Sequence, residues 1–376
     1  MVLRKGRCER PCDPIEKEMT GKRIGPGKRL KLELFAKLQD RRIQEHPLRQ
    51  LFWECTLRCN AACIHCGSDC RVSSETKDMP AADFLRVIDS LTPHVDPHTT
   101  FIIFTGGEPL MRRDLEKVGK ELYRREYPWG IVTNGILLDR KRFDSLLASG
   151  IHTGTVSLDG FREEHTWMRG HPKAFDNASN AIRMMAAEPD FVSDVVTCVN
   201  QRSLPRLAEF KEYLISLGVR SWRIFTIFPV GRARQYPELQ LTNEQFTDLM
   251  DFIVATRKEG RIELSFACEG FLGGYEEEVR NAFYHCEAGV SVASVLADGS
   301  ISACPSIRSK FYQGNIYRDD FWEVWQHRFE MYRDRSWARQ GICADCKMFR
   351  YCRGNGMHLH DEEGKLLVCH YNRLTR

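Results

Sequence analysis

The stretch Cys59–Cys66, CNAACIHC, places three cysteines within eight residues, at positions 59, 63 and 66. Three thiolates from one short loop can bind three irons of a [4Fe–4S] cluster and leave the fourth iron open, because soft sulfur suits iron. A zinc ion is the alternative, because zinc normally takes four protein ligands and His65 or Cys70 could supply the fourth. The spacing favours iron–sulfur over zinc, and both over cysteines that only pack in a core.

The composition of the whole chain excludes several classes of protein. The chain has 376 residues, 42% hydrophobic and 28% charged, which is ordinary for a folded protein with one large domain and smaller ones. No long apolar run or signal core is present, which predicts a soluble, cytoplasmic protein without a membrane span. The net charge of +4 gives no basis for nucleic-acid binding. Fifteen cysteines, an odd number, favour metal or cluster ligation over disulfides.

Short apolar runs alternate with amphipathic helical stretches from residue 51 onward. This alternation predicts an α/β fold, a partial (β/α)6 TIM-like barrel whose functional residues follow the carboxyl ends of its strands. The predicted strands are 51–54, 100–105, 130–133, 153–158, 192–199 and 220–228, and the predicted helices between them are 80–91, 113–125, 141–149, 174–187 and 204–217. A further helix over 243–257 and a strand over 262–266 are predicted after the sixth strand.

The rest of the chain divides around this core. Residues 1–48 are predicted to form a basic N-terminal extension, with a helix over 30–44 and with Cys8 and Cys12 in an unassigned role. Residues 49–266 form the predicted core domain. Residues 267–376 are dense in cysteine and show little regular periodicity, which indicates a second domain.

Short polar motifs directly follow the predicted strands. Gly106-Gly107-Glu108-Pro109 follows the second strand, Thr133-Asn134-Gly135 the third, and Ser157-Leu158-Asp159-Gly160 the fourth. Each motif alone is also typical of a turn between a strand and a helix. In this order and spacing, and with the cysteine loop after the first strand, they resemble the radical S-adenosylmethionine (SAM) enzymes over roughly residues 50 to 235.

That resemblance implies a [4Fe–4S] cluster whose open iron binds the amino and carboxylate groups of SAM. One electron cleaves SAM, and the resulting 5′-deoxyadenosyl radical takes a hydrogen atom from the substrate. Radical generation in this family needs no acid–base pair, so no catalytic side chain is assigned. The implied cluster ligands are Cys59, Cys63 and Cys66; the implied SAM-binding residues are Gly106, Gly107, Glu108 and Pro109 for the methionine ammonium, Ser157 and Asp159 for the ribose and methionyl end, and His65 and residues 228–231 for the adenine.

The C-terminal cysteines resemble a second family pattern, the SPASM extension of peptide-modifying radical enzymes, which houses auxiliary iron–sulfur clusters. The resemblance implies a distal [4Fe–4S] cluster on Cys343, Cys346, Cys352 and Cys369. A proximal cluster would use Cys286 and Cys304, but Gly356 stands where the family has a further cysteine. We expect Cys268 to be the third ligand of an incompletely ligated proximal cluster; the alternative is one auxiliary cluster, with Cys268 packing as a small hydrophobe.

The resemblance implies oxidative modification of a peptide or protein substrate, as in the peptide maturases, with an electron donor such as flavodoxin or ferredoxin. Pro305 argues against the sulfatase-maturing branch, which has an aspartate immediately after the cysteine equivalent to Cys304. Two other functions stay open. One is radical chemistry on a small molecule or a tetrapyrrole cofactor precursor, and the other is a metal-binding redox scaffold without turnover.

Overall fold

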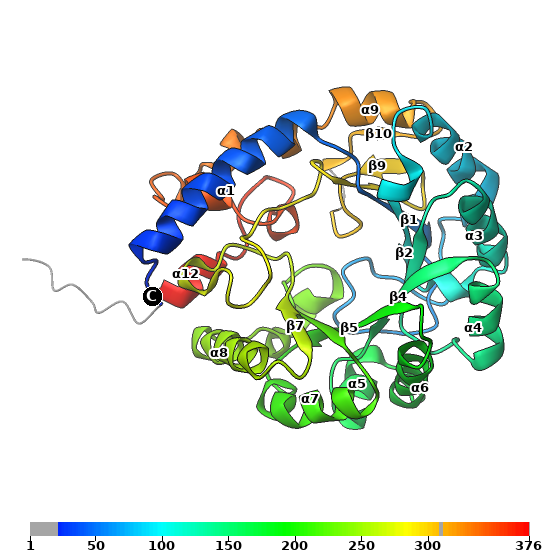
Figure 1. The fold of residues 1–376 in the computed structure, drawn as a ribbon, viewed down its shortest axis with the longest axis horizontal. Coiled ribbons are helices and arrows are strands. Elements are labelled where there is room, and N and C mark those ends of the chain that lie inside the picture. The colour runs from blue at the N-terminus through cyan, green and yellow to red at the C-terminus, as the bar shows by residue number, and fades with distance from the viewer. Residues whose placement is uncertain (1–21, 308–310, 376) are drawn as a thin grey trace, which may run out of the picture.

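The computed structural model describes residues 22–307 and 311–375, so Cys8 and Cys12 lie outside the described residues. One curved sheet of ten strands, in the order β10-β9-β8-β1-β2-β3-β4-β5-β6-β7, organises the molecule, with helices on its outer side (Figure 1). Neighbouring strands from β1 to β7 run parallel, which confirms the predicted partial barrel. These strands are β1 (Gln50–Thr56), β2 (Phe101–Gly106), β3 (Trp129–Thr133), β4 (Ile151–Ser157), β5 (Val192–Val199), β6 (Ser221–Thr226) and β7 (Glu263–Phe266).

The helices that connect these strands agree with the predicted ones to within a few residues, with one addition. They are α2 (Ala81–Leu91), α3 (Leu115–Arg124), α4 (Arg140–Leu147), α6 (Ala174–Ala186), α7 (Leu207–Ser216) and α8 (Asn243–Glu259). The addition is α5 (Arg162–Arg169), between β4 and α6. Local chemistry sets some boundaries: Thr242 and Gln245 form a capping box before α8, and Gly218, with a φ of +85°, follows α7.

The core lies between the sheet and the outer helices. Large aromatic side chains from adjacent strands fill it, and Trp53, Phe104 and Trp129 are fully buried. The Trp53 ring stacks on Phe84 of α2 with 4.3 Å between ring centroids, and Phe104 lies 5.1 Å from Trp129. This packing fixes the inner strands, and therefore fixes the loops at their carboxyl ends.

The cysteine-rich C-terminal region continues the same sheet. Strand β8 (Val292–Val295) pairs in parallel with β1, and β9 (Ser300–Ser302) and β10 (Gly314–Asn315) follow antiparallel. The remaining helices of the described residues are α1 (Pro26–Glu45), α9 (Phe321–His327), α10 (Glu330–Arg333), α11 (Phe349–Cys352) and α12 (His370–Thr375). Strands β8 to β10 of the predicted second domain, residues 267–376, therefore extend the sheet of the predicted core domain.

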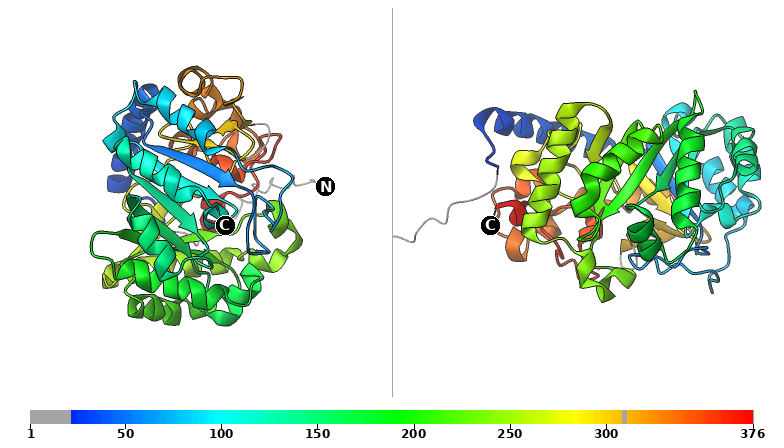
Figure 2. Two further views of the ribbon diagram at one scale, coloured as in Figure 1. Left: turned by 90° about the vertical axis from the view of Figure 1, so that its right-hand side faces the viewer. Right: turned by 90° about the horizontal axis from the view of Figure 1, so that it is seen from below.

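Helix α1 of the predicted N-terminal extension lies beside the C-terminal segments at one end of the molecule (Figures 1 and 2). The Tyr351 hydroxyl donates to the Glu33 carboxylate, and the Lys28 ammonium donates to the Gly274 carbonyl at 2.5 Å. Among the described residues, no helix is long and apolar enough to span a membrane.

Candidate active site

The three cysteines of the CNAACIHC stretch lie together in the loop after β1. Cys59 and Cys63 are buried with Ala61 and Cys70 in one small cluster, and Cys66 packs against it. The Cys70 thiol hydrogen-bonds to Cys66, which lowers the pKa of Cys66 and raises that of Cys70.

Neighbouring elements hold this loop through its backbone. The Ala62 and Ile64 amides donate to the carbonyls of Arg169 and Met168, at the end of α5, at 3.0 and 2.9 Å. From the other side, the Arg232 guanidinium donates to the Cys63 carbonyl at 2.7 Å. Hydrogen bonds from both sides therefore hold the backbone of this loop.

The glycines after β2 are required by close backbone contact with the same loop. The Gly107 and Glu108 amides donate to the Thr56 and Arg58 carbonyls at 2.7 and 2.9 Å. A Cβ atom at Gly106 would lie 2.2 Å from the Thr56 oxygen, and one at Gly107 would lie 2.3 Å from the Arg58 oxygen. Only glycine permits this approach without displacing the loop.

Gly107→Ala should therefore destabilise the protein by about 1–3 kcal/mol, because the added methyl group overlaps a backbone oxygen that cannot rotate away. The shift of the urea denaturation midpoint measures this. Gly27→Ala is the matched control: Gly27 lies in α1 with no atom within 4 Å of the new Cβ, so alanine should leave stability unchanged or raise it. Equal midpoints for the Gly107 variant and the native protein would contradict this account.

The carboxylate of Glu108 is buried and bound within the protein. It accepts from the Leu110 amide at 3.1 Å, the Thr133 hydroxyl at 2.7 Å and the Asn134 amide at 2.8 Å. Burial raises the pKa of Glu108, and these hydrogen bonds act against that rise. The carboxylate thus ties the turn after β2 to the end of β3, where Asn134 lies.

Asp159 forms a buried ion pair that sequence reasoning missed. Its carboxylate accepts from the Arg169 Nε at 2.7 Å and from the Cys198 amide at 3.0 Å, and both charged side chains are buried. Burial alone would raise the pKa of Asp159, but Arg169 and His165 hold it well below its usual range. Ser157, the other predicted residue of this motif, is half-buried at the end of β4.

Two nitrogen donors point at the cysteine sulfurs. The side-chain amide nitrogen of Asn134, Nδ2, lies 3.9 Å from the Cys59 sulfur, and Arg169 Nη1 lies 3.9 Å from the Cys63 sulfur. Burial raises the pKa of both thiols, and Arg169 acts against that rise at Cys63. Thiolate is the form that binds metal, and N–H groups and a cation beside sulfur favour it. Three soft donors in one buried loop therefore fit an iron–sulfur cluster.

His65 does not join the cysteines as a fourth ligand. One of its ring nitrogens lies with an Asp159 oxygen and the Cys198 sulfur, all within 4.8 Å of one another. This trio suits a cation poorly, because the Arg169 guanidinium already occupies Asp159. Burial, with Arg169 adding to it, lowers the pKa of His65 to about 3, so the ring is neutral at physiological pH.

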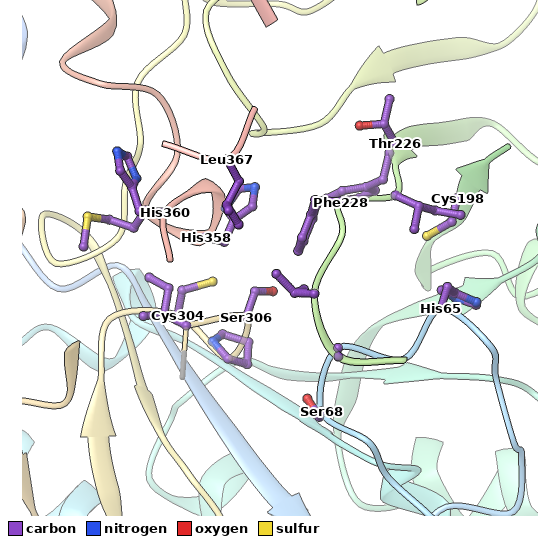
Figure 3. A pocket seen from close by; sticks show the side chains of 18 of the residues that line it. His65, Ser68, Cys198, Thr226, Phe228, Cys304, Ser306, His358, His360 and Leu367 are labelled. Carbon is purple, nitrogen blue, oxygen red and sulfur yellow. The ribbon is translucent and has the colours of Figure 1, made fainter. Parts of the chain in front are cut away.

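A cavity of about 530 Å³ opens at the carboxyl ends of the strands. Figure 3 shows His65 and Cys198 at one end of it, Cys304, His358 and His360 at the other, and Phe228 between them. Gly106 and residue 230 also line the cavity. The cavity therefore joins part of the predicted SAM-binding set, His65, Gly106 and residues 228, 230 and 231, to Cys268 and Cys304 of the C-terminal region. Its lining does not include Gly107–Pro109, Ser157 or Asp159.

The C-terminal cysteines form two separate groups. Burial is the main reason that the pKa values of Cys343 and Cys352 are raised. The Cys346 and Cys369 thiols add to both rises, so these four thiols are neighbours. The second group is Cys268, Cys286 and Cys304: burial raises the pKa of Cys304 to about 12, and the other two thiols add to the rise. Cys268 is exposed, and it lines the cavity described above. The members of each predicted ligand set are therefore neighbours, and their binding of clusters stays a prediction.

Comparisons with known proteins agree with these features. The Radical SAM superfamily profile matches residues 53–214, and the SPASM iron–sulfur cluster-binding domain profile matches residues 286–347. An AdoMet-dependent heme synthase from Methanosarcina barkeri is 26% identical over 324 residues, covering 81% of this chain and 90% of that protein. The mycofactocin maturase MftC from Mycolicibacterium smegmatis is 30% identical over 312 residues, covering 82% of this chain and 77% of that protein.

Solved structures share the fold. The anSMEcpe structure with bound AdoMet has a TM-score of 0.69 and 19% identity, covering 87% of this chain and 94% of that one. Streptococcus suis SuiB bound to the precursor peptide SuiA has a TM-score of 0.65 and 14% identity, covering 93% and 79%. The chain therefore belongs to the radical SAM superfamily and carries a SPASM domain, and its cofactors are a [4Fe–4S] cluster, SAM and auxiliary iron–sulfur clusters.

Proposed function

We propose that this enzyme removes a hydrogen atom from a side chain of a peptide or protein and so starts an oxidative modification. The observation that carries the proposal is the charge of the cavity. Among its described lining residues, Arg234 is the one guanidinium, whereas Glu54, Asp361 and Glu362 contribute carboxylates, and most of the remaining lining is apolar. Such a wall suits an uncharged or basic side chain better than an anion.

The relatives support the same substrate class without deciding it. The chain is 30% identical to a mycofactocin maturase and 26% identical to a heme synthase. A tetrapyrrole precursor is therefore the second candidate, favoured by these heme synthases and by an Fe-coproporphyrin III synthase at 25% identity. Tetrapyrrole carboxylates call for several paired cations, which the described lining does not supply.

The residues divide the work between two ends of the cavity. We assign the iron that binds SAM to Cys59, Cys63 and Cys66, and the SAM contacts to the turns at Gly106–Pro109 and Ser157–Asp159, with His65 near the adenine. When bound, the cluster and SAM supply the radical that takes the hydrogen atom. The protein holds the loop and places a nitrogen donor beside the sulfurs of Cys59 and Cys63. A flavodoxin or ferredoxin would deliver the first electron, and the auxiliary clusters would accept the electron that leaves the substrate.

The source of the abstracted hydrogen tests the substrate class. The anaerobically reconstituted enzyme, SAM and dithionite are incubated with fully deuterated short peptides encoded beside its gene, or with deuterated Fe-coproporphyrin III. We expect deuterium in 5′-deoxyadenosine with a peptide, and a peptide product that has lost two hydrogen atoms. Deuterium transfer from Fe-coproporphyrin III would instead establish the second candidate. The absence of any 5′-deoxyadenosine would leave the scaffold alternative.

A further inference from the structure

The proximal group of thiols lacks a fourth family ligand, and the structure shows what occupies its place. Gly356, where the SPASM pattern has a cysteine, has ordinary extended backbone angles, φ −66° and ψ 142°, so glycine is not needed for conformation. A Cβ atom built there would lie 2.7 Å from His358 Cε1 and 3.0 Å from His358 Nδ1. The Glu269 carbonyl oxygen would lie 2.8 Å from the same Cβ atom. The His358 imidazole and this carbonyl therefore share the space that a cysteine side chain at position 356 would need.

The free nitrogen of this ring has no partner. His358 Nε2 is buried, and no described residue hydrogen-bonds to it. The ring lines the same cavity as Cys268 and Cys304, and it lies against Phe228 with 4.8 Å between ring centroids (Figure 3). A buried ring nitrogen without a partner is costly, and a bond to a metal would satisfy it.

Other nearby groups are less suited to this position. The Glu269 carboxylate is already bound by Thr226 and by the His370 ring at 2.9 Å. His360 also has a buried, unpartnered Nε2, but its ring packs on Trp337 at 5.1 Å and its Nδ1 contacts the Gly356 carbonyl at 3.1 Å. Of the side chains that the structure describes, His358 is the one that lies in the space of the absent cysteine side chain.

We propose that His358, through Nε2, is the fourth protein ligand of the proximal auxiliary cluster, completing a set of three cysteines and one histidine. The proposal rests on the ligand set Cys268, Cys286 and Cys304 and does not depend on which substrate is modified. In the resting enzyme this cluster then has no open iron. A neutral imidazole in place of a thiolate raises the reduction potential of a cluster, which favours its acceptance of an electron.

Nitrogen hyperfine spectroscopy tests this ligand directly. The protein is produced with ¹⁵N-histidine in a background with Cys59, Cys63 and Cys66 replaced by alanine, so that only auxiliary clusters contribute, and is then reduced and measured by pulsed EPR. We expect a directly bonded ¹⁵N coupling that His358→Ala removes and that the matched variant His360→Ala retains. In His358→Ala, added ¹⁵N-imidazole should restore the coupling, and the potential of the proximal cluster should be more negative before imidazole is added.

The possible failures are distinguishable. No bonded nitrogen in the labelled parent protein, or a coupling that survives His358→Ala, overturns the proposal, as does its loss in His360→Ala alone. The labelled parent decides the question even if His358→Ala folds poorly. Iron analysis of Cys268→Ala tests the underlying site: we expect the loss of one cluster's iron, and unchanged iron would remove the proximal cluster and this proposal with it. None of these results depends on substrate turnover.

Discussion

Replacing Cys63 with alanine should reduce the formation of 5′-deoxyadenosine from SAM to the level seen without enzyme. Cys63 is buried, its carbonyl is held by Arg232, and its sulfur lies 3.9 Å from Arg169 Nη1. Two remaining thiolates hold a [4Fe–4S] cluster poorly, so no open iron is left to bind SAM. Chromatography of the anaerobic reaction measures the product, and iron analysis should show the loss of one cluster while the auxiliary iron remains.

Cys55→Ala is the matched control for this variant. Cys55 is a fully buried cysteine of β1, whose thiol packs in the main core, so its replacement should keep both iron and turnover. Cys70→Ala separates iron from zinc at the loop. A four-cysteine zinc site would lose its metal with Cys70, whereas an iron–sulfur cluster on the other three would keep its iron. Zinc in the native loop, or undiminished turnover by the Cys63 variant, would contradict the assignment.

The sequence indicates the barrel well because its strands read as short runs rich in β-branched and aromatic residues. Residues 192–199 are predicted as a strand and form β5 with the same bounds. Helix α5 was missed because its buried positions are polar: Glu164, His165 and Arg169 face the interior beside Met168. Hydrophobic periodicity cannot detect such a helix. Strands β8, β9 and β10 have four, three and two residues, too few to show alternation.

The candidate site also has a part that the sequence predicts and a part that it does not. Cysteine spacing and the order of the motifs locate the loop and the turns around it, because each follows a strand directly. Internal partners are not visible in the sequence. Spacing does not show that Glu108 is bound by three donors within the protein or that Asp159 faces Arg169. The sequence did offer one signal for the end of α5, the Arg169-Gly170 pair. Gly170, with a φ of +60°, ends this helix where it meets Ala62.

Arg169→Met should destabilise the protein by about 3–5 kcal/mol, because it leaves the buried Asp159 carboxylate without its counter-charge. Methionine keeps much of the length and helix propensity of arginine, so the change isolates the charge. The shift of the urea denaturation midpoint of the cluster-free protein measures the effect. The Ala62 and Ile64 amides of the cysteine loop donate to the carbonyls of Arg169 and Met168, so the variant should also incorporate less iron.

The double variant Asp159→Asn with Arg169→Met should recover most of this loss, because a neutral amide can still accept from the Cys198 amide at 3.0 Å. The pH dependence gives a second check. In the native protein the pKa of Asp159 is depressed, so its contribution to stability is present above the unfolded-state pKa and is lost only in strong acid. In Arg169→Met, burial without a counter-charge raises the pKa of Asp159 above its unfolded value, so protonation stabilises the folded state. The stability gap between native protein and single variant should therefore narrow as pH falls, whereas the double variant should show no such change. A gap independent of pH would mean that Arg169 acts by packing and not by charge.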